Sequence, residues 1–159
     1  MKTPMLVATA AFLVISSSFA FALASADKAA IDKWAGSGTS YTPQGAALST
    51  YQLNVENTEL APQVIQSVAT AVGSDGTTKV INQKITTTAN HFKTDSNLGQ
   101  GGGSCYGADL CESYIAGQNG VAYATTIIVD GPNDQRHITV ILKDGKAIKI
   151  LRDKVSRLQ

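Results

Sequence analysis

The chain has 159 residues, of which 43% are hydrophobic and 16% charged, and its formal net charge is +1 at pH 7. A chain of this length supports a single domain with one modest core. The balanced charge excludes a general nucleic-acid binder, because such a protein needs a surplus of lysine and arginine to displace the counterions of the phosphate backbone.

The first 26 residues have the pattern of an export signal. Lys2 gives a positive start, an apolar run covers residues 5–15, and Ala24-Ser25-Ala26 supplies the small residues that a signal peptidase requires. An uncleaved membrane anchor is the alternative, but the apolar run is shorter than the roughly 20 residues of a spanning helix. We therefore expect residues 1–26 to be a cleaved signal peptide, with no stable membrane span after cleavage. Residues 27–159 would then form one domain in the periplasm or outside the cell.

Residues 27–34 predict a short helix, because Ala30, Ile31 and Trp34 can share one side and Gly36 follows as a stop. Beyond this helix the sequence predicts strands separated by turns, since β-branched residues are frequent and apolar and polar residues alternate. The expected strands cover residues 47–55, 63–72, 77–88, 91–95, 112–116, 121–130, 137–143 and 147–151. The segment 60–72 also fits a helical spacing, so strand and helix both stay open for it.

About eight strands joined by short turns predict an all-β domain. Its expected architecture is an antiparallel up-and-down meander that closes into a small lipocalin-like barrel or curls into a half-barrel, since open edges invite aggregation. The inward side chains would line a pocket for a small ligand. The candidate pocket residues are Trp34, Tyr51, Leu53, Val68, Tyr123, Ile127 and Val140, with Val55, Ile85, Ile138 and Ile148 on the same inner face.

Cys105 and Cys111 are the only cysteines of the chain, and in an exported protein they predict one disulfide. Their C-x5-C spacing fits neither a zinc site nor a C-x-x-C redox pair. Residues 99–107 are rich in glycine, which predicts a long flexible loop pinned at its end by Cys105. The candidate partner-binding residues in this loop are Gly101, Gly102, Gly103 and Tyr106.

These features favour an exported binding protein that holds a small apolar or amphipathic ligand in the barrel. The alternative is a secreted or periplasmic interaction module, an inhibitor or immunity-type protein, that binds an envelope protein through the glycine-rich disulfide loop. Catalysis finds little support, because the acidic residues lie mostly in turns and no nucleophile is paired with a base. The sequence therefore predicts no enzyme, no catalytic residue and no metal site.

The run Trp34-Ala35-Gly36-Ser37-Gly38 resembles the start of lipocalin-like (calycin) barrels. It is most similar to the nitrobindin-type branch, whose first strand opens with G-x-W-x-G-x-G. Trp34, Gly36 and Gly38 match this motif, and Asp32 stands at the leading glycine. The resemblance implies a short helix ahead of the motif, a tryptophan that plugs the closed end of the barrel, and haem bound through one histidine late in the chain.

His91 and His137 are the only candidates for such a haem ligand, and neither lies in a motif that carries the ligand over. The residues themselves therefore predict no cofactor. A second run, Ser37-Gly38-Thr39-Ser40-Tyr41, is similar to the S-G-x-x-Y run of periplasmic inhibitors of c-type lysozyme. In those inhibitors the run lies on a loop within the barrel, whereas here it precedes the first expected strand.

Overall fold

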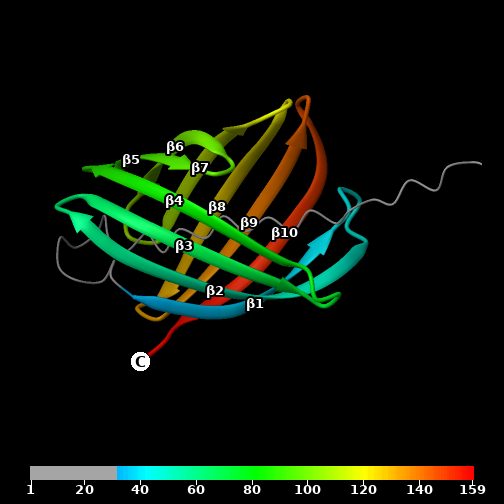
Figure 1. The fold of residues 1–159 in the computed structure, drawn as a ribbon, viewed down its shortest axis with the longest axis horizontal. Coiled ribbons are helices and arrows are strands. Elements are labelled where there is room, and N and C mark those ends of the chain that lie inside the picture. Colours follow the sequence, from blue (N-terminus) through cyan, green and yellow to red (C-terminus); the bar gives the residue numbers. More distant parts are fainter. Residues whose placement is uncertain (1–31) are drawn as a thin grey trace, which may run out of the picture.

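The computed structural model describes residues 32–159, which form a closed antiparallel β-barrel (Figure 1). The predicted signal peptide, residues 1–26, and residues 27–31 of the predicted helix lie outside the described residues. The strands are β1 (Lys33–Tyr41), β2 (Ala47–Ala61), β3 (Val64–Gly73), β4 (Thr78–Thr88), β5 (His91–Ser96), β6 (Gly99–Tyr106), β7 (Leu110–Gly117), β8 (Val121–Gly131), β9 (Asp134–Lys143) and β10 (Lys146–Arg157).

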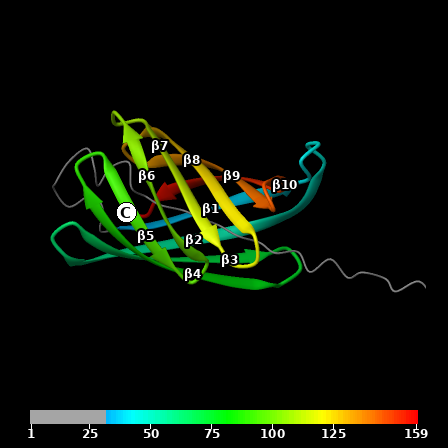
Figure 2. The same ribbon diagram turned by 90° about the horizontal axis from the view of Figure 1, so that it is seen from above.

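Each strand pairs with the next one along the chain, and β10 pairs with β1 to close the ring. The strands run obliquely around the barrel, with β2, β3 and β4 on the side opposite β7, β8 and β9 (Figure 2). The predicted all-β antiparallel meander is confirmed, and it is a full barrel rather than a half-barrel. Closure leaves the sheet without an open edge that could pair with another chain. Among residues 32–159 we find no helix with the length and hydropathy of a membrane span.

The prediction of about eight strands is wrong, because residues 32–159 form ten. The two missed strands are β1, which the sequence placed in a helix and a loop, and β6, which the sequence placed in a flexible loop. Lys33 and Trp34 belong to β1 rather than to a helix. Both missed strands are rich in glycine, which is depleted from ordinary strands because it adds no side chain to the packing.

Close approach of neighbouring strands explains the glycines of β1 and β6. A Cβ atom on Gly36 would overlap the carbonyl oxygen of Lys154, and one on Gly101 would overlap the carbonyl oxygen of Tyr114. In the ring of ten, four strands separate β1 from β6 on either side, so these two strands lie opposite each other. The barrel therefore has glycine-rich strands at two opposite positions, and glycine permits sharp bending in a sheet.

For residues 60–72 the sequence left both strand and helix open, and the structure shows strand rather than helix. Side chains of β3 are buried at every second position, as in a strand with one face towards a core. The buried positions are Ile65, Ser67, Ala69, Ala71 and Gly73.

Buried apolar side chains of the barrel gather in two clusters. The large cluster contains Trp34, Tyr51, Leu53, Val55, Ala69, Ala71, Ile81, Ile115, Tyr123, Ile141, Leu151 and Val155. The small cluster contains Ile65, Ile85, Phe92, Cys105, Cys111, Ile127 and Val129. The interior is therefore not one continuous apolar core.

Candidate functional site in the barrel interior

Five of the seven predicted pocket residues lie in the barrel interior: Trp34, Tyr51, Leu53, Tyr123 and Ile127 are all buried. The other two do not, since buried and more exposed positions alternate along β3 and β9 and leave Val68 and Val140 on the outer face. Their assignment to the pocket is wrong.

The same correction applies to two further inner-face assignments. Ile138 lies on the outer face of β9, and Ile148 is 49% exposed next to a register shift between Ala147 and Lys149. In β9 the inward positions are mostly polar, so the rule that apolar residues face inward selected the wrong side.

A layer of polar side chains separates the two apolar clusters along four strands. Each of its members lies between a residue of the small cluster and a residue of the large cluster, two positions away on either side. Ser67, for example, lies between Ile65 and Ala69 on β3. We call the set the polar layer. It consists of Ser67 on β3, Gln83 on β4, Ser113 on β7 and Thr125 on β8.

Three of these four side chains have a buried polar atom without a hydrogen-bond partner among the described residues. The atoms are Ser67 Oγ, Gln83 Nε2 and Ser113 Oγ; Asn57 Oδ1, on the residue paired with Ser67 in the β2–β3 register, is a fourth. Thr125 is satisfied, since its hydroxyl lies 3.0 Å from that of Thr139. A buried polar atom without a partner costs about 1–3 kcal/mol. Such atoms require an explanation, and a bound molecule or ordered water is the usual one.

A chain of hydrogen bonds runs from the predicted pocket residue Tyr51, in the large cluster, to β9. The Tyr51 hydroxyl donates to Asp153 Oδ2 at 3.1 Å, and Asp153 Oδ1 lies 2.7 Å from His137 Nδ1. His137 Nε2 lies 3.3 Å from Gln135 Oε1. Burial, and then the nearby Asp153 carboxylate, raise the pKa of Tyr51 far above its ordinary value, so this hydroxyl stays protonated.

Gly38 makes this network possible. It lies on β1 between Tyr51 on β2 and Asp153 on β10, and is paired with both. A Cβ atom at Gly38 would overlap the ring of Tyr51. Gly38 therefore gives the tyrosine room to reach across one strand to the aspartate.

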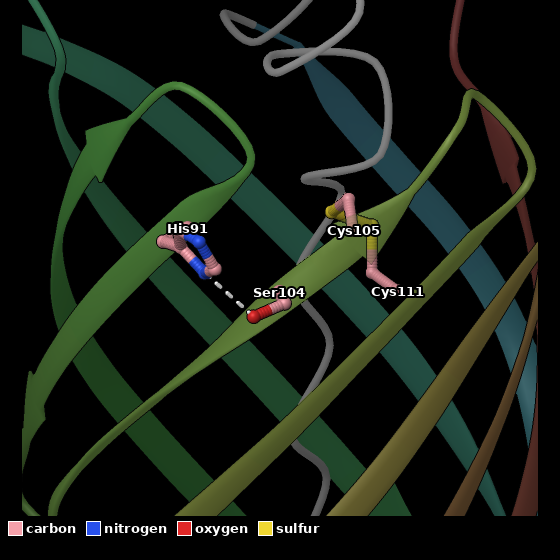
Figure 3. Close-up of a disulfide and its surroundings, with 4 residues drawn as sticks. All are labelled: His91, Ser104, Cys105 and Cys111. Carbon is pink, nitrogen blue, oxygen red and sulfur yellow. Dashed lines mark hydrogen bonds between the residues drawn. A yellow bond between two sulfur atoms is a disulfide. The ribbon is translucent and has the colours of Figure 1, made fainter.

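The haem ligation implied by the resemblance does not fit these residues. Both ring nitrogens of His137 already have partners, and its side chain is 0% exposed. His91 projects from the outer face of β5, where its Nδ1 lies 2.7 Å from Ser104 Oγ (Figure 3). Among the described residues we find no group of three or more His, Cys, Asp or Glu side chains that could hold a metal ion.

The predicted disulfide between Cys105 and Cys111 is present and joins opposite residues of the β6–β7 hairpin (Figure 3). Both cysteines are buried in the small cluster. The prediction of a flexible glycine-rich loop is wrong, because Gly101, Gly102 and Gly103 lie within β6, paired on both sides. Only residues 107–109 turn the chain between β6 and β7.

An open depression of about 460 Å³ lies on the outer face of β6–β9. Gly102, Gly103, Tyr106 and Val140 contribute to its lining, so members of both predicted sites meet there rather than in the interior. Tyr106 is 59% exposed and Tyr114, on the same face, is 52% exposed. A Cβ atom at Gly102 would overlap the carbonyl oxygen of Phe92, so this position requires glycine.

Comparison with known proteins gives fold neighbours but no sequence family. No family model matches the chain, and no curated protein matches it. An S-type phycobiliprotein lyase, CPES, from Guillardia theta is 9% identical with a TM-score of 0.65, and the match covers 82% of this chain and 89% of that one. Rv2717c from M. tuberculosis is 12% identical with a TM-score of 0.65, over 92% of this chain and 100% of that one.

A protein of unknown function from the DUF3598 family of Nostoc punctiforme is 8% identical with a TM-score of 0.65, over 82% of this chain and 48% of that one. Identities this low establish the fold alone. The chain shares the closed antiparallel barrel fold with these proteins. The resemblance to the nitrobindin-type branch in particular rests on the residues around Trp34 alone.

The sequence-based prediction that the chain is not an enzyme is contradicted. One protein with this fold is a lyase, so a meander barrel without a recognisable catalytic motif is no argument against catalysis. At 9% identity the lyase provides no reaction and no catalytic residue for this chain.

Proposed function

We propose that the protein binds one small amphipathic ligand in the barrel interior, with the polar part of the ligand against the polar layer. The observation that carries this proposal is the set of buried, unpartnered atoms Ser67 Oγ, Gln83 Nε2, Ser113 Oγ and Asn57 Oδ1. They comprise a donor, an acceptor and two hydroxyls that serve as either. A ligand with hydroxyl, carbonyl or amide groups would satisfy them and remove their desolvation cost.

The apolar part of the ligand would lie against the two clusters on either side of the polar layer. Five predicted pocket residues contribute there, with Trp34, Tyr51, Leu53 and Tyr123 in the large cluster and Ile127 in the small one. Ligand pockets combine such apolar walls with a few placed polar groups. The fold is compatible with the proposal, since some barrels of eight or more strands hold one small ligand.

We also propose that the protein is exported. The signal-like residues 1–26 and the Cys105–Cys111 disulfide support this, because disulfides persist in oxidising compartments. The rival interaction module has lost its main support, since the glycine-rich segment is a paired strand rather than a loop. Intact mass of the protein recovered from the periplasm or medium, compared with the full-chain mass, tests both export and cleavage near residue 26.

Native mass spectrometry of the purified protein tests ligand binding. We expect a bound mass that disappears on denaturation and that is lost from the double variant Ser67→Ala/Ser113→Ala, which removes two unpartnered hydroxyls. Thr70→Ala, a change on the outer face of β3, is the matched control and should keep the bound mass. A wild-type protein whose native mass equals its sequence mass, with ordered waters on the polar layer in a crystal structure, would contradict the proposal.

A further inference from the structure

The open depression on the outer face of β6–β9 is lined by two exposed tyrosines and one carboxylate. Tyr106 is 59% exposed, Tyr114 is 52% exposed, and Glu112 is exposed as well. All three line the depression, whose volume of about 460 Å³ lies in the range of small-molecule sites. These side chains project from the outside of the barrel, so the depression is distinct from the interior ligand site proposed above.

The register of β6 and β7 places the two tyrosines on either side of Glu112. Tyr114 follows Glu112 by two residues on β7, so both side chains project from the same face. Tyr106 is paired with Leu110, which precedes Glu112 by two residues on that face. Tyr106 is therefore a diagonal neighbour of Glu112, and aromatic side chains reach such neighbours. A group that binds the carboxylate has a tyrosine ring on each side along the strands.

Small neighbours leave the ring of Tyr114 uncovered. The residues paired with Tyr114 are Gly102 on β6 and Ala124 on β8. Neither has a side chain long enough to cover an aromatic ring, and all three residues line the depression. The face of the ring is thus open to a ligand.

The Glu112 carboxylate has no partner in the described part of the chain. Among residues 32–159 it takes part in no ion pair and no hydrogen bond. Ser104, its register neighbour on β6, has its hydroxyl 2.7 Å from His91 Nδ1 on β5 instead (Figure 3). Of the described residues that line the depression, Glu112 alone is charged. The lining therefore carries a negative charge that none of its own side chains balances.

The basic side chains near the depression have acidic neighbours of their own. Arg136, on the outer face of β9, donates to both carboxylate oxygens of Asp130. Lys93 lines a second depression, on the outer face of β4–β6, together with Asp95. Neither side chain forms an ion pair with Glu112, so the cation that would complement Glu112 has to come from outside the described chain.

We propose that this depression binds a small molecule with a quaternary ammonium group, which lies against Glu112 between the rings of Tyr106 and Tyr114. The negative face of an aromatic ring attracts a cation, as a carboxylate does. Quaternary ammonium groups are recognised in this way by aromatic side chains. A hard metal ion is a poor match, because it requires several oxygen ligands and the lining offers one carboxylate.

Three probes of similar skeleton test this assignment: choline, ethanolamine and 3,3-dimethyl-1-butanol. They carry a quaternary ammonium, a primary ammonium and a neutral tert-butyl group, respectively. Each is titrated into the purified protein while NMR follows the backbone amide signals of β6 and β7. We expect choline to bind with a millimolar Kd, at least about tenfold more tightly than the neutral alcohol and about fivefold more tightly than ethanolamine.

Two variants locate the site. Glu112→Gln removes the charge and keeps the shape, whereas Tyr106→Leu/Tyr114→Leu removes the rings and keeps apolar side chains. Each should weaken choline binding at least about fivefold and change the affinity for the neutral alcohol by no more than about twofold. Glu59→Gln is the matched control, because Glu59 is an exposed glutamate on β2, on the side of the barrel opposite β7 (Figure 2). It should leave choline binding unchanged.

Equal affinity for choline and the neutral alcohol would overturn the inference, and so would tighter binding of ethanolamine than of choline. Amide shifts confined to strands other than β6–β9, or a Glu59→Gln variant as impaired as Glu112→Gln, would overturn the location. The dispersion of the NMR spectrum shows that each variant is folded, and the comparison of probes on the wild-type protein stands without any variant. None of these outcomes decides the interior site, which is tested by the mass that the purified protein retains.

Discussion

Removing one unpartnered hydroxyl from the polar layer should stabilise the ligand-free protein, whereas removing a partnered one should destabilise it. Ser67 and Ser40 form a matched pair, since both are 0% exposed on inward-facing strand positions. Ser67 Oγ has no partner among the described residues. Ser40 Oγ lies 2.8 Å from Ser49 Oγ and 3.3 Å from the Ser49 carbonyl oxygen. We therefore expect Ser67→Ala and Ser40→Ala to act in opposite directions.

The magnitudes follow from the hydrogen bonds that each serine makes. Ser67→Ala removes a desolvation cost of about 1–3 kcal/mol and creates a void of one oxygen atom, so a net gain of about 1 kcal/mol in unfolding free energy is expected. Ser40→Ala loses a hydrogen bond worth about 0.5–1.5 kcal/mol. The two variants should thus differ by about 2 kcal/mol.

Urea unfolding followed by tryptophan fluorescence measures this difference, because Trp34 is the only tryptophan and is 1% exposed. The protein is first unfolded and refolded to remove any bound molecule, and equal m-values establish that both variants expose the same surface. With ligand restored, the gain of Ser67→Ala should shrink or reverse, since only the wild-type hydroxyl then has a partner. If Ser67→Ala destabilises the ligand-free protein as much as Ser40→Ala does, the hydroxyl of Ser67 is already satisfied and the argument for the ligand site is refuted.

Three further outcomes test the barrel itself. Gly101→Ala should cost at least about 3 kcal/mol in unfolding free energy, because the new Cβ atom meets the backbone of β7. Gly45→Ala, at φ +91° with open space around it, should cost only about 1–2 kcal/mol. Similar losses in the two variants would contradict the close approach of β6 to β7. The double variant Cys105→Ala/Cys111→Ala should lower the unfolding free energy by about 2.4 kcal/mol, the chain-entropy value for closing so short a loop. A change near zero, together with a wild-type intact mass that shows two free thiols, would contradict the disulfide. Above pH 10, folded Tyr51 holds a proton that the unfolded chain releases, so stability should fall with rising pH by up to about 1.4 kcal/mol per pH unit from this group. The raised pKa of Tyr123 also lowers stability as the pH rises, and the lowered pKa of Lys149 has the opposite effect. Comparing wild type with Tyr51→Phe therefore isolates the contribution of Tyr51 to the slope of unfolding free energy against pH. An unchanged slope in Tyr51→Phe would rule out that contribution.

The sequence predicted every strand that alternates in the ordinary way and missed the two that depend on glycine. Alternation of apolar and polar residues marks a strand through its side chains. In β1 and β6 the relevant information is the absence of side chains, as at Gly36 and Gly101, where the neighbouring backbone leaves no room for a Cβ atom. That requirement arises only once the strands on either side are in place, so local sequence reasoning assigned both segments to helix or loop.

The candidate site was predicted in part, for a related reason. Tyr51, Leu53 and Ile127 were placed inside correctly because their strands bury apolar residues. Val140 was placed inside wrongly because β9 buries mostly polar residues. Val68 was placed inside wrongly because apolar residues occur on both faces of β3, and its inner face carries mainly small ones. A polar interior reverses the usual rule in β9, and in β3 the alternation alone does not choose between the faces, so only pairing with the neighbouring strands shows which face is inward.

The unpartnered polar atoms in the interior are the strongest reason to expect a ligand. A domain of this size is stable by about 5–15 kcal/mol, and the four unpartnered atoms at Asn57, Ser67, Gln83 and Ser113 together cost about 4–12 kcal/mol at 1–3 kcal/mol each. An apolar residue of similar size at these positions would avoid that cost and join the two clusters into one core. Because the polar side chains occur on four strands and next to one another in register at Asn57, Ser67 and Gln83, they act as a common surface rather than as separate defects. A molecule that hydrogen-bonds to this surface would stabilise the barrel most, and its binding would appear as a large rise in melting temperature.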